Sequence, residues 1–207
     1  LYKQPLVYNN ETYTSRNDSL GNAYMNNGKL VNKPMNFSNK NRISLADLHH
    51  ILRGIIFPEN VPGFSRFGIS KSDYDFVHKY MSEVPSESVY PSYDSAKYPD
   101  AYVKFLLFGS RPQPLPKNIR IFNKVGDAYG QLVDVAYIID LDKHIEFFLS
   151  ATIYCNSNGI LNDDTYDYDT IGFPFMKNLG QVLYEFESKR QKINLPDLSP
   201  FKITYDK

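Results

Sequence analysis

The sequence has one cysteine, no net charge and no long apolar run. Cys155 alone excludes an internal disulfide and a zinc site with several cysteines, and it leaves the redox compartment open. Because 23 Lys and Arg balance 23 Asp and Glu, a bulk electrostatic grip on nucleic acid or on an anionic membrane is not expected. No apolar run approaches the roughly 20 residues of a membrane span. The start at Leu1 shows neither a signal-peptide pattern nor an initiator methionine, which suggests a processed or truncated chain.

What the chain does contain is enough apolar surface for a folded core. Hydrophobic residues make up 42% of the chain, with 14 Phe and 17 Tyr among them. Residues 1–43 differ, because they are polar and hold 10 of the 18 asparagines. We expect an irregular arm there, with one hairpin at Asn27-Gly28, that rests on another part of the protein. Residues 44–207 then form the domain.

Helical periodicity begins at Ser44. Apolar residues at spacings of three and four predict helices at about 45–56 and 71–82, each opened by a serine with an aspartate three positions later. A short helix is predicted over 100–108, and a final helix over 173–190.

Between these helices the apolar pattern is that of strands. The predicted strands are 118–126, ending near Gly126, then 132–140 and 145–154. Short links between them favour an antiparallel meander. We therefore predict an α+β fold in which the last helix covers one sheet face and the 45–108 helices form a second layer.

One motif stands where the first strand meets the second. It is Asn123-Lys124-Val125-Gly126-Asp127-Ala128-Tyr129-Gly130. It resembles the Lys-Thr/Ser-Gly motif of the serine β-lactamase and penicillin-binding-protein superfamily, which lies on an edge strand beside the nucleophile. As in class A members, a Tyr-Gly turn, two apolar strands, an acidic loop and a C-terminal helix follow. The resemblance covers about residues 40–190, and it is nearest to the secreted serine hydrolases of Bacteroidetes with asparagine- and aromatic-rich insertions.

The resemblance implies catalytic roles for Lys124 and Asp127. Lys124 would place an ammonium near the nucleophile and the substrate carboxylate, and the backbone amide of Asp127 would donate to the oxyanion. Val125, Gly126 and Tyr129 would border the substrate. Val125 stands where the family has a hydroxyl, which disfavours penicillin-type substrates and favours an esterase, a peptidase or an inactive relative.

The family's nucleophile lies in Ser-x-x-Lys, upstream of this motif. We expect no serine anywhere in the chain to have a lysine three positions later, so the nucleophile motif is predicted to be missing from the chain. Ser15-Arg16-Asn17 imitates the family's Ser-x-Asn motif, but it lies in the arm. The chain is then the C-terminal part of a longer hydrolase, inactive alone, whose missing N-terminal segment is its partner.

Histidines and aspartates are the candidate metal ligands. His49 and His50 are adjacent on a helix and point in different directions, and His78 and His144 have no spaced partners. The aspartates lack the EF-hand spacing and suit the positive end of the following helix. They are Asp163, Asp164, Asp167 and Asp169. We expect no metal and no cofactor, and we expect Cys155 to be a buried thiol rather than a nucleophile.

Two hypotheses follow. The first is a serine hydrolase that forms an acyl-enzyme with a small-molecule, peptide or ester substrate and is periplasmic or secreted, as its resemblance implies. It predicts an open groove or apolar surface beside Lys124. The alternative is a non-catalytic secreted binding domain that uses the asparagine- and tyrosine-rich insertions. It predicts a closed fold in which Lys124 is merely exposed.

Overall fold

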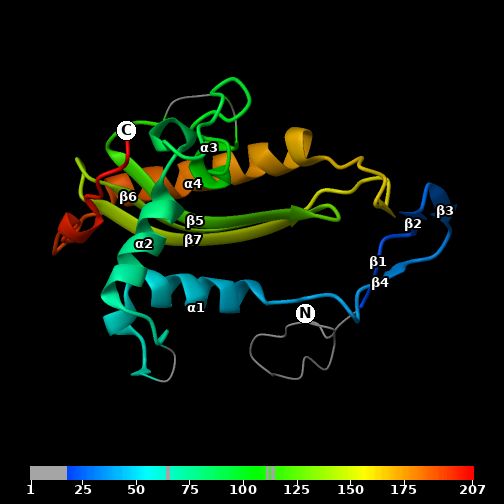
Figure 1. Cartoon of the computed structure of the whole chain (residues 1–207), viewed down its shortest axis with the longest axis horizontal. Helices are drawn as coiled ribbons and strands as arrows, with labels where there is room; N and C mark the ends of the chain where they lie inside the picture. Colours follow the sequence, from blue (N-terminus) through cyan, green and yellow to red (C-terminus); the bar gives the residue numbers. More distant parts are fainter. Residues whose placement is uncertain (1–17, 64–65, 111, 113–114) are drawn as a thin grey trace.

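An antiparallel sheet of three long strands organises the molecule (Figure 1). The computed structural model describes residues 18–63, 66–110, 112 and 115–207. β5 (Ile119–Ala128), β6 (Gln131–Asp140) and β7 (Ile145–Tyr154) form the predicted meander, with β6 in the middle.

The first strand does not end near Gly126 as predicted. Gly126 pairs with Val133 and the ladder continues to Ala128. The chain reverses instead at Tyr129 and Gly130, whose φ values of 55° and 80° give a two-residue hairpin turn. A glycine inside a strand therefore marked no boundary here.

One face of the sheet packs on α4 (Phe173–Lys189), which follows a π-helical turn at Tyr168–Gly172. The prediction that the last helix covers a sheet face is confirmed. The cluster between them is apolar and buried, and includes Ile121, Leu132, Ala136, Ile138 and Met176.

The other face packs on α1 (Leu45–Ile56), while α2 (Lys71–Ser82) lies against β5. Its core cluster includes Leu52, Ile56, Phe122, Tyr137 and Phe201. Both helices begin where predicted, because their N-terminal serines cap them. Ser44 Oγ accepts from the Asp47 amide (3.0 Å), and Ser70 forms a capping box with Asp73.

The helix predicted over 100–108 is wrong over most of its length. Only α3 (Phe105–Phe108) is helical, and Leu107 within it has a φ of 79°. The reason is tertiary: the Leu106 amide donates to Asp134 (2.9 Å) instead of continuing a helix. α3 also packs beside α4, so it does not join α1 and α2 in the second layer.

The described part of the arm, residues 18–43, forms short ladders. β1 (Ser19–Leu20) pairs with β4 (Met35–Asn36), and β2 (Ala23–Asn26) pairs with β3 (Lys29–Val31). The predicted hairpin at Asn27-Gly28 is confirmed, with φ values of 49° and 75°. β2 also pairs in parallel with β8 (Ile160–Leu161), so the arm does rest on the loop before α4.

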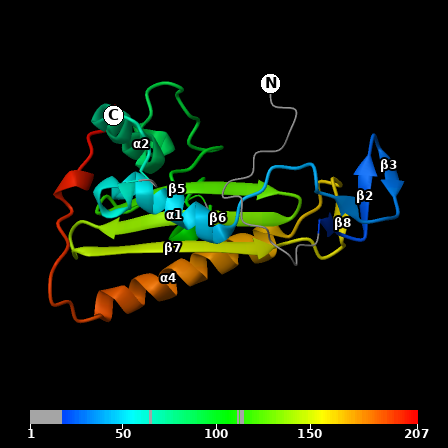
Figure 2. The ribbon, with the colours of Figure 1, turned by 90° about the horizontal axis from the view of Figure 1, so that it is seen from below.

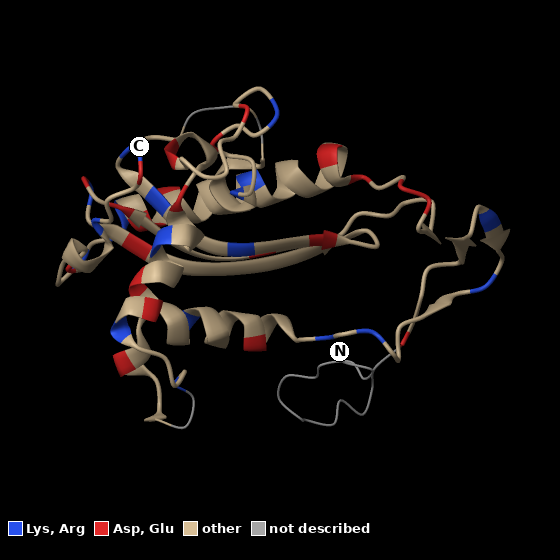
Figure 3. Ribbon diagram, in the orientation of Figure 1, with Lys and Arg blue, Asp and Glu red and all other residues tan. Residues whose placement is uncertain are grey.

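Among the described residues, single 3-10 turns lie at Pro58–Asn60, Pro85–Glu87 and Ser199–Phe201. Figure 3 shows residues of both charge signs interspersed along the ribbon. Across the described part of the chain, no helix combines the length and apolarity needed to cross a membrane.

Candidate active site at the β5 edge

The outer edge of β5 offers unpaired backbone groups. Lys104 Nζ donates to Ile121 O (2.8 Å) and Lys124 Nζ donates to Val125 O (2.7 Å), so odd-numbered carbonyls turn away from β6. The N–H and C=O of one residue point to the same side of a strand, so the Val125 and Asp127 amides also turn outward. Among the described residues no strand pairs with this edge. We call residues 124–128 the open β5 edge.

Side chains on the open β5 edge divide between the two sheet faces. Lys124 is exposed on the α1 face, two residues after buried Phe122. Val125 points the other way and packs half-buried against the cluster beneath α4. At Gly126 an added Cβ would lie 3.2 Å from Val133 Cγ1, so a side chain there would crowd the α1 face. Because Gly126 has no side chain, the α1 face of the sheet carries none at this position beside Lys124.

Tyr129 lies at the turn that ends the edge. Its ring packs edge to face on Phe37, with 5.0 Å between centroids, and Lys40 Nζ lies 5.7 Å from the ring centre. The arm therefore holds this ring. The structure places the five predicted site residues within six consecutive positions, with Lys124 and Tyr129 at the two ends.

A histidine–serine pair on the same face was missed by the sequence analysis. His49 Nδ1 lies 2.8 Å from Ser150 Oγ. Ser150 faces Val135, which in turn faces Lys124, so the three residues form one row across the sheet. The pair links α1 to β7 across 101 positions, and no local pattern signals a contact of that separation.

The environment of His49 favours a neutral imidazole. The pKa of His49 is lowered by burial, and further by the positive charges of Arg53 and His50. Its ring packs edge to face on Phe148, with centroids 5.7 Å apart. His49 is thus a half-buried polar contact between α1 and the sheet.

A buried polar network closes the other half of the β5 edge. Lys104 Nζ donates to Met81 O, Ile121 O and Asn123 Oδ1, each at 2.8 Å. Asn123 Nδ2 then donates to Asp134 Oδ1 at 3.0 Å. These bonds occupy the edge up to Asn123, so the open part begins at Lys124.

Burial shifts both charged members of the network toward neutrality. It lowers the pKa of Lys104 to about 8, although the negative charge of Asp134 opposes that change. It raises the pKa of Asp134 to about 7, against the hydrogen bond from Leu106. Sequence reasoning missed this network because it placed Lys104 on a helix.

Two of the four loop aspartates accept local hydrogen bonds. Asp167 accepts from Ser157 N (2.8 Å), and Asp163 accepts from Asn158 Nδ2 (2.7 Å) and Thr165 N (3.0 Å). Within the described ranges, no three His, Cys, Asp or Glu side chains gather as a metal site. Cys155 is buried, as predicted, and burial raises the pKa of its thiol.

The expectation that Ser-x-x-Lys is missing needs a correction, because Ser199-Pro200-Phe201-Lys202 has that spacing. Ser199 and Lys202 are exposed, and the serine begins a 3-10 turn instead of a helix. In Figure 1 this turn lies at the end of the sheet away from the Tyr129-Gly130 hairpin. It supplies no nucleophile to the open β5 edge. Ser15-Arg16-Asn17 lies outside the described residues.

Comparisons with family models, with curated proteins and with solved structures find no match to this chain.

Proposed function

We propose that this chain is the C-terminal, sheet-bearing part of a serine hydrolase similar to β-lactamases and penicillin-binding proteins, with a Ser-x-x-Lys nucleophile supplied by another segment. The observation that carries the proposal is the open β5 edge. It places an exposed ammonium, that of Lys124, three residues before the outward backbone amide of Asp127, on a strand edge with which no described strand pairs.

The chemistry of this edge suits acyl transfer. An extended acyl group can lie along β5 as an added strand and bond to the outward groups of Val125. Its carbonyl oxygen then accepts from the Asp127 amide, and the negative charge that develops on attack is stabilised by that amide and by the Lys124 ammonium. The motif supplies electrostatic stabilisation, while the nucleophile comes from elsewhere.

The orientation of Val125 bears on the substrate. Its side chain packs into the cluster beneath α4, so the residue offers only backbone groups to the edge. A substrate carboxylate that would accept a hydrogen bond from a Thr or Ser hydroxyl at this position has no such donor in Val125. We therefore propose peptide or ester substrates over penicillins, met in the periplasm or outside the cell.

The test uses the intact gene product and three acylating probes: a fluorophosphonate, a fluorescent penicillin and a chromogenic cephalosporin. Asp127→Pro removes the outward amide without removing a ladder bond, since that N–H faces away from β6. We expect Asp127→Pro to slow acylation by about 100- to 1000-fold. Asp127→Asn keeps the amide and should stay within a few fold of the parent.

Lys124→Ala should slow acylation by about 100-fold or more. Its matched control is Lys71→Ala, which removes an exposed lysine from α2. Unfolding temperatures of all variants separate catalysis from folding. Failure of all three probes to label a serine, or equal rates for the two Asp127 variants, rejects the hydrolase.

One observation favours the alternative, a binding domain. Tyr93, Tyr98 and Tyr102 pack edge to face in series, with centroids 5.4 and 5.0 Å apart, and all three are exposed. Exposed tyrosines held in fixed positions are typical of recognition surfaces. If no probe labels a serine, this tyrosine series becomes the surface to mutate.

A further inference from the structure

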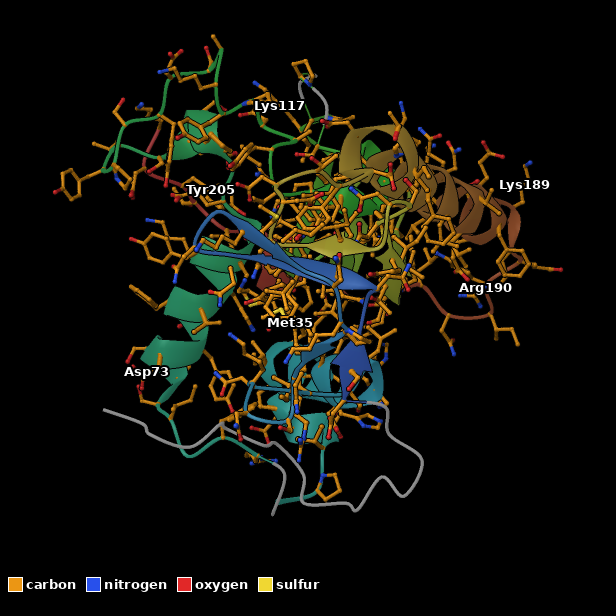
Figure 4. The ribbon with its side chains drawn as sticks, turned by 90° about the vertical axis from the view of Figure 1, so that its right-hand side faces the viewer. Met35, Asp73, Lys117, Lys189, Arg190 and Tyr205 are labelled. Carbon is orange, nitrogen blue, oxygen red and sulfur yellow. The ribbon has the colours of Figure 1, made fainter. Side chains whose placement is uncertain are left out.

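Lys104 is a lysine in the core of the protein. It is 1% exposed, whereas Lys117 and Lys189, which are labelled in Figure 4, are exposed. Lysine is almost never fully buried unless its amine is paired. In Figure 2 the chain that follows α2 lies on the β5 side of the sheet, and Lys104 reaches from this segment to the strand. Its amine is therefore paired with groups of the protein rather than with bulk water.

Three oxygen atoms surround the amine. Two backbone carbonyls, Met81 O and Ile121 O, each lie 2.8 Å from Nζ, and Asn123 Oδ1 lies at the same distance. An ammonium donates to all three. A neutral amine has only two N–H groups, which the two backbone carbonyls can hold. Its lone pair then faces the carboxamide of Asn123.

Asn123 is fixed between the amine and a carboxyl group. Its Nδ2 donates to Val103 O (2.8 Å) and to Asp134 Oδ1 (3.0 Å), so the carboxamide cannot turn freely. Asn123 is 7% exposed and Asp134 is 0% exposed. An amine, a carboxamide and a carboxyl group are thus held together before any reaction. This is the condition under which an intramolecular reaction is accelerated most.

Burial supplies the protonation states that such a reaction needs. It lowers the pKa of Lys104 to about 8, so about a tenth of the amine is free at pH 7, against about one part in 2000 at its ordinary pKa. A free amine is a nucleophile, whereas an ammonium is not. Burial also raises the pKa of Asp134, which favours a carboxylic acid that can donate a proton to a leaving nitrogen.

We propose that Lys104 and Asn123 join in an intramolecular isopeptide bond, with Asp134 as the catalytic acid and base. The Nζ lone pair forms a bond to Cγ of Asn123, and an electron pair of the C=O bond moves to Oδ1. The Asp134 carboxyl group then gives its proton to Nδ2. As the C=O bond forms again, the bond between Cγ and Nδ2 breaks and ammonia leaves.

The last step restores the catalyst. The Asp134 carboxylate takes a proton from Nζ, which is then the nitrogen of a secondary amide. One amine and one carboxamide have been converted to that amide and one ammonia, so no oxidant, reductant or further reactant is needed. Formation removes the charge of Lys104 from the core and leaves the Asp134 carboxyl group able to titrate.

The bond attaches the segment before α3 to β5. It closes a loop across 19 positions, which restricts the unfolded chain as a disulfide does. Unlike a disulfide, it does not depend on the redox compartment. The single cysteine of the chain cannot form an internal disulfide, so the isopeptide bond supplies a covalent cross-link by a different chemistry.

Peptide mapping of the intact gene product tests the proposal. Trypsin cuts after a free lysine but not after one whose amine is part of an amide. We expect no cut at Lys104, and we expect the peptide that contains it to be joined to the peptide of residues 121–124. The joined mass should lie about 17 Da, one ammonia, below the sum of the two. Recovery of a peptide that ends at Lys104, with residues 121–124 unlinked, overturns the proposal.

Loss of ammonia has a second source, which the same map separates. An asparagine before a glycine, such as Asn27 before Gly28, can cyclise to a succinimide with the same change in mass. That product stays within one peptide, whereas the isopeptide bond joins two. A loss of ammonia confined to the peptide that contains Asn27 therefore overturns the proposal.

Asp134→Asn tests the role of the carboxyl group. Asparagine has nearly the same size but can neither give up nor take up the transferred proton, so the joined peptide should form at least about 100-fold more slowly. Lys71→Ala, which removes an exposed lysine from α2, should leave its formation at the parental level. Formation at the parental rate in Asp134→Asn overturns the assignment of Asp134.

The map of the parent protein decides whether the bond exists, even where a variant does not fold. Neither readout involves acylation of a serine. The result is therefore separate from that of the hydrolase test.

Discussion

Asp134 and Lys104 are held in the core through Asn123, which donates to the one and accepts from the other. Neither side chain reaches water, so a charge on either one lowers the stability of the fold, and burial shifts both toward their neutral forms. The network fixes where the β5 edge closes and where it opens. Its protonation is therefore linked to the stability of the strand that carries Lys124.

This linkage gives a pH prediction. The pKa of Asp134 is raised to about 7 in the folded protein, so between pH 4 and 7 only the folded state holds that proton. Stability must fall as pH rises through this window, with a limiting slope of about 1.4 kcal/mol per pH unit. Between pH 4 and 7 an unlinked Lys104 is charged in both states, because its pKa in the folded protein is about 8, and it adds little slope.

Asp134→Asn should remove this slope, as urea unfolding at several pH values can measure. The contribution of His49 is common to parent and variant, so it cancels in the difference. A parent and variant with parallel stability profiles between pH 4 and 7 would contradict the assignment.

At the scale of elements, α3 and α4 touch through backbone. Gly180 lets Leu107 approach α4, and the positive φ of Leu107 fits α3 to that contact. Alanine is the better helix former by about 1 kcal/mol, so propensity alone favours its presence at position 180. The close contact between Gly180 and the Leu107 backbone disfavours alanine at this position.

We predict that Gly180→Ala lowers the free energy of unfolding by about 1–3 kcal/mol, because the added methyl group meets Leu107 backbone that cannot move freely. Asn178→Ala, at an exposed position of the same helix, should instead raise it slightly. Thermal unfolding of the two variants provides the comparison. Equal stabilisation by both alanine substitutions would contradict this prediction, because it would show that the Leu107 backbone shifts to accommodate the added methyl group at no cost.

Elements with local signals could be predicted from the sequence, and elements shaped by distant partners could not. Ser44 and Ser70 cap the helices that follow them, and the alternation in β5 together with the apolar runs of β6 and β7 predicted the meander. The helix predicted over 100–108 was wrong because the Leu106 amide donates to Asp134, which lies 28 residues later in the chain. The candidate site divides in the same way: Lys124 and Asp127 lie in one motif, whereas His49 and Ser150 meet only in the fold.

At the scale of the whole molecule, large apolar side chains gather on the side that α4 and the segment after it present. If another part of the intact protein covers this side, Val182 is buried in an apolar contact there. Val182→Lys should then lower its free energy of unfolding by about 2 kcal/mol or more, since a charge is placed in an apolar contact. Gln181→Lys, on the neighbouring exposed position, should change it by less than about 0.5 kcal/mol. Indistinguishable unfolding curves for the two lysine variants would mean that α4 faces water.

The parallel pairing of β2 with β8 joins residues 137 positions apart, as does the contact of Asn162 with Met25. Such a contact closes a long loop at high entropic cost, while each hairpin of the meander closes across a short turn. The meander is therefore expected to form early and the arm to join it late. The two-residue ladder also contributes little to global stability, so the arm can open by a local transition that leaves the core folded. The free energy of opening the arm is thus smaller than the free energy of unfolding the whole protein, whereas the three-stranded sheet unfolds as one cooperative unit.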